Sequence, residues 1–340
     1  MINRILDELG GDPDINVLWI ASHRSGNAIA KVWQAVAGYV VAFLRMPFAD
    51  LVHIHSSAEV SFFRKSAFYW LARLWRRPVI WHLHSPNTDF ERFYSRRDAA
   101  GRYARYVLGS CRHIVVLSDS WISLAENILP RDKLRVIYNP IPRVVPDEES
   151  IPREPGRILY LAHLIQRKGF PLLIKAFANV AEEFPQARLV FAGSGELKEA
   201  KALCDELGIR SRVDFLGWIG EPQRTHELRR AGIFALPSYQ EGLPMGVLEA
   251  LAFGLAVVAT PVGGIGDVVE DGRNGLLVKP GDDQQLAVAL RSLLAEPALA
   301  SRLATEGQRS VAQFSPGALA GEWKALYLET INEVETVEAL

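Results

Sequence analysis

Residues 237–264 read PSYQEGLPMGVLEALAFGLAVVATPVGG, and this stretch does most to decide the fold. It places a loop containing Glu241 between the apolar run Ile233–Leu236, which predicts a strand, and a helix that opens near Pro244. A further strand is expected directly afterwards, at Ala256–Ala259. Strand, loop, helix and strand in this order indicate a parallel sheet with helical crossovers.

The same alternation runs outward from this stretch to both ends of the chain. Further apolar runs that predict strands are Asn16–Ile20, Leu51–Ile54, Val79–Leu83, His113–Leu117, Leu134–Ile137, Ile158–Leu161, Arg188–Phe191 and Val213–Phe215. Helical periodicity separates them, at Ala28–Leu44, Val60–Trp75, Pro171–Glu183, Leu197–Leu207 and Gln223–Arg230. The pattern predicts an α/β protein of two doubly wound, Rossmann-like domains facing across a cleft, with ligands beyond the carboxyl ends of the strands.

A proline-rich stretch divides the two halves. Residues 139–157 (NPIPRVVPDEESIPREPGR) hold five prolines, four acidic residues and no apolar period, which is typical of a linker. We therefore predict a first domain over 1–143, a linker over 144–156 and a second domain over 157–315. A closing helix over 316–340 is expected to pack back toward the first domain.

Composition narrows the class of protein. A chain of 340 residues predicts about two domains, and its net charge of −1 makes nucleic acid an unexpected partner. Cys111 and Cys204 offer neither a disulfide framework nor metal-ligand spacing, which favours a reducing cytoplasm. The acidic start lacks the apolar run of a signal peptide, and the most apolar helical run, Val32–Leu44, is too short to span a bilayer.

Two carboxylates in the opening stretch suit a sugar. Glu241 stands on the loop, and Glu249 is about one and a half turns into the helix that Pro244 opens in its first turn. The free amides at that helix start attract a phosphate, and Gly242 lets the backbone approach a ligand closely. The two carboxylates would repel a diphosphate, so we expect them to accept hydrogen bonds from sugar hydroxyls. The alternative is an exposed loop followed by a core helix with one buried acid.

Two further loops follow predicted strands of the second half. In 158–169 (ILYLAHLIQRKG), the strand ends near His163, and Lys168 comes before the next helix, where it can reach a phosphate. The bland interpretation is a solvated Arg167–Lys168 pair. The turn 191–196 (FAGSGE) is a weaker signal of a loop that passes close to a nucleoside.

Histidines gather at the ends of two predicted strands of the first half. His82 and His84 alternate with apolar residues in VIWHLHSP (79–86), and His53 and His55 form a similar pair. We expect His84 to face the cleft, where a neutral imidazole accepts a hydrogen bond from an acceptor hydroxyl or binds the donor sugar. A structural role is the alternative.

Taken together, these residues resemble the retaining glycosyltransferases of family four, which have the GT-B fold. The family's E-x7-E element corresponds to Glu241 and Glu249 within EGLPMGVLEALAFGLAVVAT. The resemblance is strongest over 157–280. It continues through DLVHIHSSAEVSFFRKS (50–66) and HLHSPNTDFERFY (82–94), which look like the exopolysaccharide and lipopolysaccharide type of group 1 transferase.

The resemblance implies a role for each matching position. Glu241 would bind the transferred sugar near the reacting carbon, Glu249 would bind the ribose, and His84 would touch the donor sugar or the acceptor. The implied donor-binding residues are His163, Arg167, Lys168, Gly242, Leu243, Pro244, Met245 and Glu249. The donor would be a UDP- or GDP-sugar, the acceptor a glycan or a lipid-linked molecule, and the reaction would retain configuration without a metal or other cofactor.

One departure from the family affects the leaving group. The family usually has Gly-Arg where this chain has Ala162-His163. Arginine carries a permanent charge, whereas histidine is mostly neutral at pH 7. Either Arg167 compensates, or leaving-group stabilisation weakens and activity falls as the pH rises.

Three competing functions stay open. A nicotinamide dehydrogenase requires G-x-G-x-x-G between a strand and a helix, but Gly264-Ile265-Gly266 is followed by Val269 at the third glycine. A nucleotide-sugar epimerase or a phosphorylase would use the same fold. A degenerate protein would bind a sugar nucleotide or a partner without turnover.

The D-x-D string at Asp12–Asp14 resembles a metal site, but it lies in an early loop and is discounted.

Residues 60–77 (VSFFRKSAFYWLARLWRR) predict a helix that combines aromatic and basic side chains. Contact with an anionic membrane is one interpretation, because each basic residue near such lipid contributes about 1 kcal/mol. The protein would then be cytoplasmic and peripheral on the inner face of the membrane. The alternative is a core helix with a solvated basic face.

The N-terminus predicts an incomplete first domain. Ile2, Ile5, Leu6 and Leu9 fall on one helical face, so a helix opens the chain where a doubly wound domain opens with a strand. Asn16–Ile20 would then be the second strand of the sheet, or would slide into the central place. We expect a late start site or a natural truncation.

Overall fold

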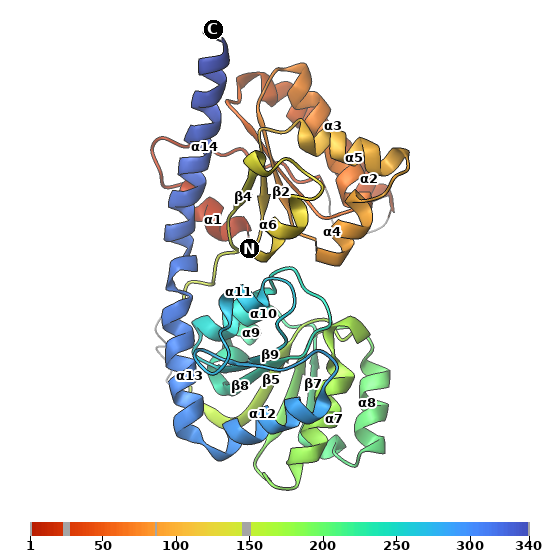
Figure 1. The fold of residues 1–340 in the computed structure, drawn as a ribbon, viewed down its shortest axis with the longest axis vertical. Helices are drawn as coiled ribbons and strands as arrows, with labels where there is room; N and C mark the ends of the chain where they lie inside the picture. Colours follow the sequence, from red (N-terminus) through yellow and green to blue (C-terminus); the bar gives the residue numbers. More distant parts are fainter. Residues whose placement is uncertain (1, 23–27, 86, 145–150, 339–340) are drawn as a thin grey trace. The chain divides into compact units, whose positions relative to one another are not determined.

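The computed structural model describes residues 2–22, 28–85, 87–144 and 151–338. The chain divides into two compact units, which we call unit 1 (Met1–Pro140 with Pro316–Leu340) and unit 2 (Ile141–Ser315). Each unit contains one parallel sheet flanked by helices, so the predicted α/β class is confirmed (Figure 1).

The described residues of unit 1 form four parallel strands in the order β1-β2-β3-β4, which is also their order along the chain. Buried aromatic side chains dominate its core, including Phe62, Trp81 and Trp121. The described elements of unit 1 are α1 (Ile2–Leu9), α2 (Ala28–Arg45), β1 (Val52–Ser56), α3 (Val60–Leu74), β2 (Val79–Leu83), α4 (Asn87–Tyr94), α5 (Ala99–Gly109), β3 (His113–Val116), α6 (Ser120–Ala125), β4 (Leu134–Val136) and α14 (Pro316–Glu338).

The last helix of the chain belongs to unit 1. α14 packs along α1, and the Lys324 ammonium binds both carboxylates of the D-x-D string, at 2.9 Å from Asp12 and 2.8 Å from Asp14. Two more ion pairs, Arg112–Glu333 and Arg135–Glu329, join α14 to the sheet. The helix therefore closes the fold of a unit whose other residues all precede Ile141, with the whole of unit 2 between them in the sequence.

The prediction of a strand at Asn16–Ile20 is wrong. Within the described residues 2–22, this segment joins no sheet, and β1 is an edge strand paired only with β2 in the described part of unit 1. The segment is held instead by side chains: Trp19 packs against His55 with ring centroids 6.0 Å apart, and Gln34 donates to the Ala21 carbonyl. The N-terminal helix is confirmed as α1.

In unit 2, residues 141–144 and 151–315 are described, and they contain six parallel strands in the order β10-β9-β8-β5-β6-β7. The chain moves from β5 outward in one direction and from β8 outward in the other, so the strand order reverses between β5 and β8. α7 and α8 cover one face of the sheet, and α9 and α10 cover the other (Figure 1). The elements are β5 (Glu154–Leu161), α7 (Phe170–Ala181), β6 (Arg188–Ala192), α8 (Leu197–Glu206), β7 (Val213–Gly217), α9 (Glu221–Arg230), β8 (Ala231–Leu236), α10 (Met245–Ala252), β9 (Ala256–Ala259), α11 (Ile265–Val268), β10 (Leu276–Leu277), α12 (Asp283–Ala295) and α13 (Pro297–Ser310).

The end of the expected linker is already part of unit 2. β5 begins at Glu154, which pairs with Ala231, rather than at Ile158. Arg153 anchors the approach, because its guanidinium donates to the carbonyls of Ala231, Phe253 and Gly254. Pro155 lies where the β5–β8 register shifts, an irregularity that tolerates a residue without an N–H. Residues 145–150 lie outside the described part.

Candidate functional site

The best-formed candidate site lies in unit 2, at the point where its strand order reverses. Loops 162–169 and 237–244 follow β5 and β8, and ligands of doubly wound sheets bind between such loops. The two loops are joined by a hydrogen bond from the Tyr239 amide to the Arg167 carbonyl (2.9 Å). Gly169 makes this approach possible: its φ is +72°, and a β-carbon there would lie 1.9 Å from the Pro237 carbonyl oxygen.

A buried ion pair occupies the centre of this site. Glu241 is 4% exposed, and the Lys168 ammonium lies 2.6 Å from each of its carboxylate oxygens. The Ser238 hydroxyl donates to the same carboxylate at 2.7 Å, and Thr260 in turn donates to the Ser238 carbonyl. A buried charge requires such pairing, because its water has been removed. The structure thus brings together two of the predicted residues, 73 positions apart, and adds Ser238, which sequence reasoning missed.

The start of α10 lies beside this pair. Gly242, Leu243 and Pro244 form the loop that leads into Met245, the first helical residue. Pro244 was expected in the first turn but is the residue before it, with an extended ψ of 123°. The Gly264 amide donates to the Gly242 carbonyl at 2.6 Å and fixes the loop against the end of β9. The first amides of a helix lack intrahelical partners and carry partial positive charge, so this end favours an anion.

Glu249, the second predicted carboxylate, lies inside α10 and is 2% exposed. The guanidinium of Arg224 on α9 approaches it to 3.5 Å. Arg224 is a second residue that sequence reasoning missed. A carboxylate with an Arg four positions later on one helix would have signalled a pair, but these two residues come from different helices.

His163 and Arg167 lie on the same β5 loop but make different contacts. Nδ1 of the His163 ring donates to the Ser194 carbonyl (3.0 Å), so the ring lies against the turn after β6 rather than in the Lys168–Glu241 pair. Arg167 donates to the Gln240 carbonyl and lines an open pocket of about 400 Å³ together with Gln166, Tyr239 and Gln240. The structure therefore places the predicted donor-binding residues on two neighbouring loops, after β5 and β8, and in the helix α10 that follows the second loop.

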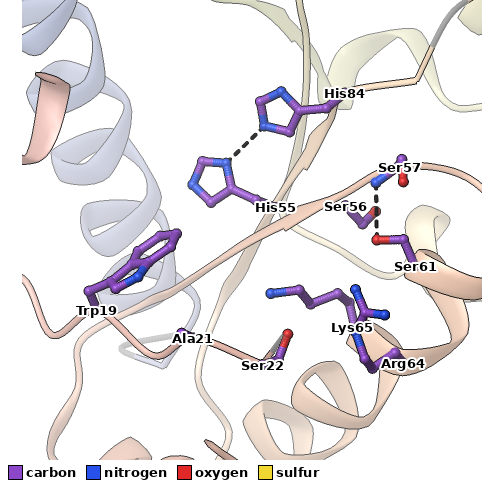
Figure 2. A pocket seen from close by; sticks show the side chains of 10 residues that line it. All are labelled: Trp19, Ala21, Ser22, His55, Ser56, Ser57, Ser61, Arg64, Lys65 and His84. Carbon is purple, nitrogen blue, oxygen red and sulfur yellow. Dashed lines mark hydrogen bonds between the residues drawn. The ribbon is translucent and has the colours of Figure 1, made fainter. Parts of the chain in front are cut away.

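His84, the other predicted catalytic residue, lies in a separate cavity of unit 1 (Figure 2). Its Nε2 atom lies 2.9 Å from Nδ1 of His55. The cavity measures about 310 Å³ and is lined by Trp19, Ala21, Ser22, His55, Ser56, Ser57, Ser61, Arg64, Lys65 and His84.

Positive charge is the notable property of this unit 1 cavity. Burial, together with repulsion from the neighbouring Arg64, lowers the pKa of Lys65 to about 8. The Arg64 Nε is buried and has no hydrogen-bond partner among the described residues. The two cations with the serine hydroxyls of the lining form a surface suited to an anionic group.

The remaining histidines of unit 1 lie beside His84. Burial lowers the pKa of His53 to about 3 and that of His84 to about 4, and it lowers the pKa values of His55 and His82 well below the usual range. The mutual repulsion of the protonated rings acts in the same direction. All four rings are therefore neutral at pH 7, with one lone pair each, and the hydrogen bond between His55 and His84 uses one of these lone pairs.

The aromatic helix expected at 60–77 is partly a core helix. Phe62, Phe68 and Tyr69 of α3 are buried in the unit 1 core, whereas Phe63 and Trp70 are exposed. The larger apolar surface belongs to α2 and the turn after it, where the exposed side chains are Val32, Trp33, Val36, Val40, Val41, Phe43, Leu44 and Phe48. None of the helices in the described ranges combines the length and apolar character needed to cross a bilayer.

Comparison with known protein families matches both halves of the chain. Residues 144–310 match the family described as "Glycosyl transferases group 1", and residues 19–143 match "Glycosyltransferase Family 4". A Haemophilus influenzae protein named an uncharacterized glycosyltransferase is 28% identical over 73% of this chain and 69% of its own length. The putative glycosyltransferase EpsD of Bacillus subtilis is 34% identical over 50% of this chain and 44% of its own length.

Solved structures share the fold. Sucrose-phosphate synthase from Thermosynechococcus elongatus superposes with a TM-score of 0.73 and 22% identity, covering 95% of this chain and 87% of that one. HepE from Anabaena, solved with UDP and glucose, superposes with a TM-score of 0.69 and 20% identity, covering 89% and 82%. Both likenesses concern the arrangement of strands and helices.

Proposed function

The chain belongs to the group 1, family four glycosyltransferases, and we propose that it moves a sugar from a UDP- or GDP-sugar to a glycan or lipid-linked acceptor with retention of configuration. The observation that carries the proposal is the buried Lys168–Glu241 pair, which lies at the strand reversal of unit 2 beside the start of α10. Related folds have been solved with UDP and with UDP-glucose, which supports a nucleotide-sugar donor.

The chemistry of the pair suits a donor sugar. A carboxylate has about four lone-pair positions, and Lys168 and Ser238 use three of those of Glu241. The remaining capacity accepts a hydrogen bond from a sugar hydroxyl. The Lys168 ammonium has three N–H donors and uses two on Glu241, so one remains for a phosphate oxygen. Glu241 would thereby hold the transferred sugar while Lys168 holds the leaving diphosphate.

The diphosphate would bind at the start of α10, with the backbone of Gly242 to Met245 around it. The helix dipole and Lys168 supply positive charge there, so the transfer step needs no metal ion on the diphosphate. Glu249, oriented by Arg224, would accept hydrogen bonds from the ribose. Arg167 would add charge from the open pocket, and His163 would contribute from the neighbouring turn.

The acceptor would bind to the unit 1 cavity, where His84 contacts its hydroxyl. Lipid-linked acceptors carry phosphate groups, and Arg64 and Lys65 supply the matching charge. The exposed apolar side chains of α2, with Arg45 at its end, would rest on an anionic membrane and leave the protein peripheral on its cytoplasmic face. This surface takes the place of the α3 aromatics, most of which are buried.

Donor binding and turnover test the proposal. A thermal-shift screen of the full chain against UDP- and GDP-sugars should show stabilisation by one class, because a ligand at 100 times its dissociation constant adds about 2.7 kcal/mol. Adding EDTA should leave this shift unchanged. Incubation with the stabilising donor and lipid extract should then yield a labelled acceptor. Binding without release of nucleotide diphosphate under any acceptor condition would favour a protein that binds without turnover.

Liposome co-sedimentation tests the membrane contact separately. The exchange Trp33→Glu on α2 should reduce binding to anionic vesicles several-fold at low salt. Phe63→Glu on α3 is the matched control, since this side chain is also exposed but lies outside the α2 surface. Equal losses in the two variants, or no binding by the unmodified chain, would contradict the contact.

A further inference from the structure

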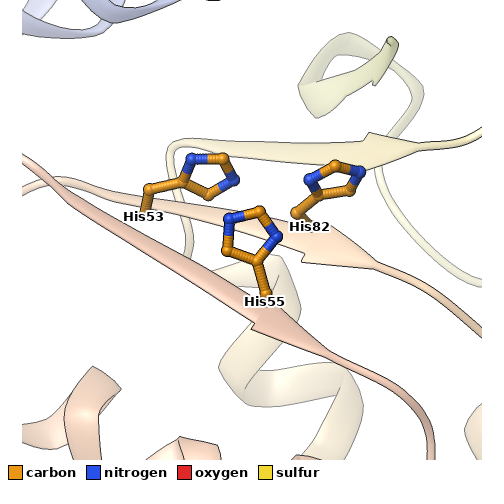
Figure 3. A group of neighbouring side chains, drawn as sticks. All are labelled: His53, His55 and His82. Atoms are coloured by element: carbon orange, nitrogen blue, oxygen red, sulfur yellow. The ribbon is translucent and has the colours of Figure 1, made fainter. Parts of the chain in front are cut away.

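Three histidines from neighbouring strands of unit 1 lie together on one face of the sheet (Figure 3). His53 and His55 are two residues apart on β1, so they point to the same side. His82 on β2 is the direct cross-strand partner of His55. The ring centroids are 4.1 Å apart for His53 and His55, 4.9 Å for His55 and His82, and 5.5 Å for His53 and His82.

Several nitrogens of this cluster are buried without a partner. His82 is 4% exposed, and neither of its ring nitrogens forms a hydrogen bond within the described residues. The same holds for Nε2 of His53. Nearly all buried polar atoms in proteins have a partner, so three orphaned nitrogens in one cluster indicate a missing ligand or water.

The hydrogen bonds of His53 and His55 involve their Nδ1 atoms and leave their Nε2 atoms free to bind a metal ion. Nδ1 of His53 lies 2.8 Å from the Tyr327 hydroxyl, and Nδ1 of His55 lies 2.9 Å from Nε2 of His84. Both rings are therefore held at Nδ1, and their Nε2 atoms remain. Metal-binding histidines typically have this arrangement, in which one nitrogen binds the ion and the other is fixed by a hydrogen bond.

We propose that His53, His55 and His82 bind one divalent transition-metal ion of the zinc class. One nitrogen from each ring can be chosen so that all three lie within 4.8 Å of one another. Nitrogens on a tetrahedral zinc are about 3.4 Å apart, given bonds of about 2.1 Å, so small ring rotations complete the site. Three imidazoles without a carboxylate suit zinc, cobalt, nickel or copper rather than magnesium or calcium.

The fourth coordination position would remain open toward the unit 1 cavity. Of the three ligands, His55 also lines that cavity, and Lys65 is near enough to influence its charge. A dication beside Lys65 and Arg64 is repelled by them, and an anion at the open position would offset this repulsion. The site is separate from the donor diphosphate in unit 2, so the inference does not depend on the proposed transfer reaction.

A second group of potential ligands in unit 1 provides the control. His113, Glu329 and Glu333 also lie within reach of a common ion. However, Glu329 is already paired with Arg135 at 2.6 Å and Glu333 with Arg112. Their carboxylates are satisfied and partly solvated, so we expect no specific metal binding there.

Metal titration of the full chain tests the inference directly. Protein treated with EDTA and exchanged into chelator-free buffer is titrated with Zn²⁺ by calorimetry and with Co²⁺ by visible absorption. We expect one ion per chain, with the intense bands of four-coordinate cobalt. His82→Phe should abolish both signals, whereas His113→Ala should leave them unchanged.

Folding and adventitious binding are separated by two further measurements. Circular dichroism checks whether the His82→Phe variant folds. If it does not fold, His55→Gln replaces a less buried ring and should weaken Co²⁺ binding at least tenfold. Stoichiometric binding that survives in both variants would overturn the assignment, as would no binding by the unmodified chain, which would leave buried water as the partner of these rings. Donor binding by unit 2 should be the same with and without metal. A chain that binds no donor would therefore contradict the proposed function and leave the metal site unaffected.

Discussion

The two units treat their buried polar groups in opposite ways. In unit 2 the buried charges are paired with each other before any ligand arrives: Lys168 with Glu241, and Arg157 with Glu227 at 2.7 Å. In unit 1 the buried polar groups include the neutral imidazoles of β1 and β2, and several of their ring nitrogens lack partners within the described residues. Unit 2 therefore presents a preorganised site, whereas the histidine face of unit 1 is satisfied only by something added to it.

The largest effect is expected from breaking the central pair of unit 2. Lys168→Met leaves the Glu241 carboxylate buried and without its cation, and removing one partner of a buried pair typically costs 3–5 kcal/mol. Since Lys168 retains some exposure, we expect a loss of about 3 kcal/mol in the free energy of unfolding, measured by urea denaturation. The second exchange Glu241→Leu in the same chain should recover part of it. A loss below about 1 kcal/mol would show that the Lys168–Glu241 pair is solvated, and unit 2 would then not differ from unit 1 in the way described.

Glu241→Gln separates catalysis from pairing. The amide keeps the shape and can still accept from Lys168, but it loses the charge near the reacting carbon. We expect turnover to fall about 100-fold, equivalent to about 2.7 kcal/mol, while the donor dissociation constant changes only a few-fold. Glu227→Gln is the matched control, because it removes another buried, arginine-paired carboxylate of unit 2 and should lower stability without lowering turnover per folded molecule.

Acid should destabilise unit 1 before unit 2. The pKa values of His53 and His84 are lowered to about 3 and about 4, while an unfolded chain has histidines near 6.5. Between these values the unfolded state binds more protons, so stability falls as the pH drops from about 6.5 toward 4. Seven of the eight tryptophans lie in unit 1, so tryptophan fluorescence of metal-free protein reports this transition. Unfolding of unit 2 is monitored by its sensitivity to protease. If both units unfold at the same pH, the expected difference between them is contradicted.

The smallest effect is expected from Lys65 in the unit 1 cavity. Its pKa is lowered from 10.5 to about 8, so the folded chain loses this proton before the unfolded chain does. The burial cost is present in full below pH 8 and is relieved as the pH rises toward 10.5. Lys65→Met should therefore stabilise the protein by about 1 kcal/mol at pH 7, after allowance for partial solvent exposure, and by less at pH 10. Destabilisation at pH 7 would mean that a bound anion already compensates the charge.

The sequence predicted elements well where the chain is apolar and regular. β2 matches its expected range, and β9 does too, because buried parallel strands read as short apolar runs. Asn16–Ile20 is also a short, mostly apolar run. A strand joins a sheet only if a partner strand lies beside it in register, and the composition of a segment does not reveal this. Similarly, the proline-rich stretch hid the start of β5, because the hydrogen bonds of Arg153 that anchor it reach 78 to 101 residues along the chain.

For the site, the sequence predicted residue types but not their partners. Lys168 and Glu241 were each assigned to the donor, yet their pairing depends on the adjacency of β5 and β8, which the order of elements alone does not specify. Arg224 and Ser238 were missed for the same reason. The two H-x-H strings did indicate neighbouring strand ends, but only the register of His55 opposite His82 reveals the cluster.

The placement of α14 has a consequence for how the protein is made. Its Tyr327 binds His53, and Trp323 packs on His53 and His82, so the last 25 residues complete the face formed by β1 and β2. A nascent chain leaving the ribosome can fold unit 2 while unit 1 still lacks its closing helix. The second half should thus mature before the first, with the histidine face kept open until α14 has been made. Arrested chains ending at Ser315 should show a protease-resistant unit 2 and a sensitive unit 1; equal resistance would show that unit 1 closes without its final helix.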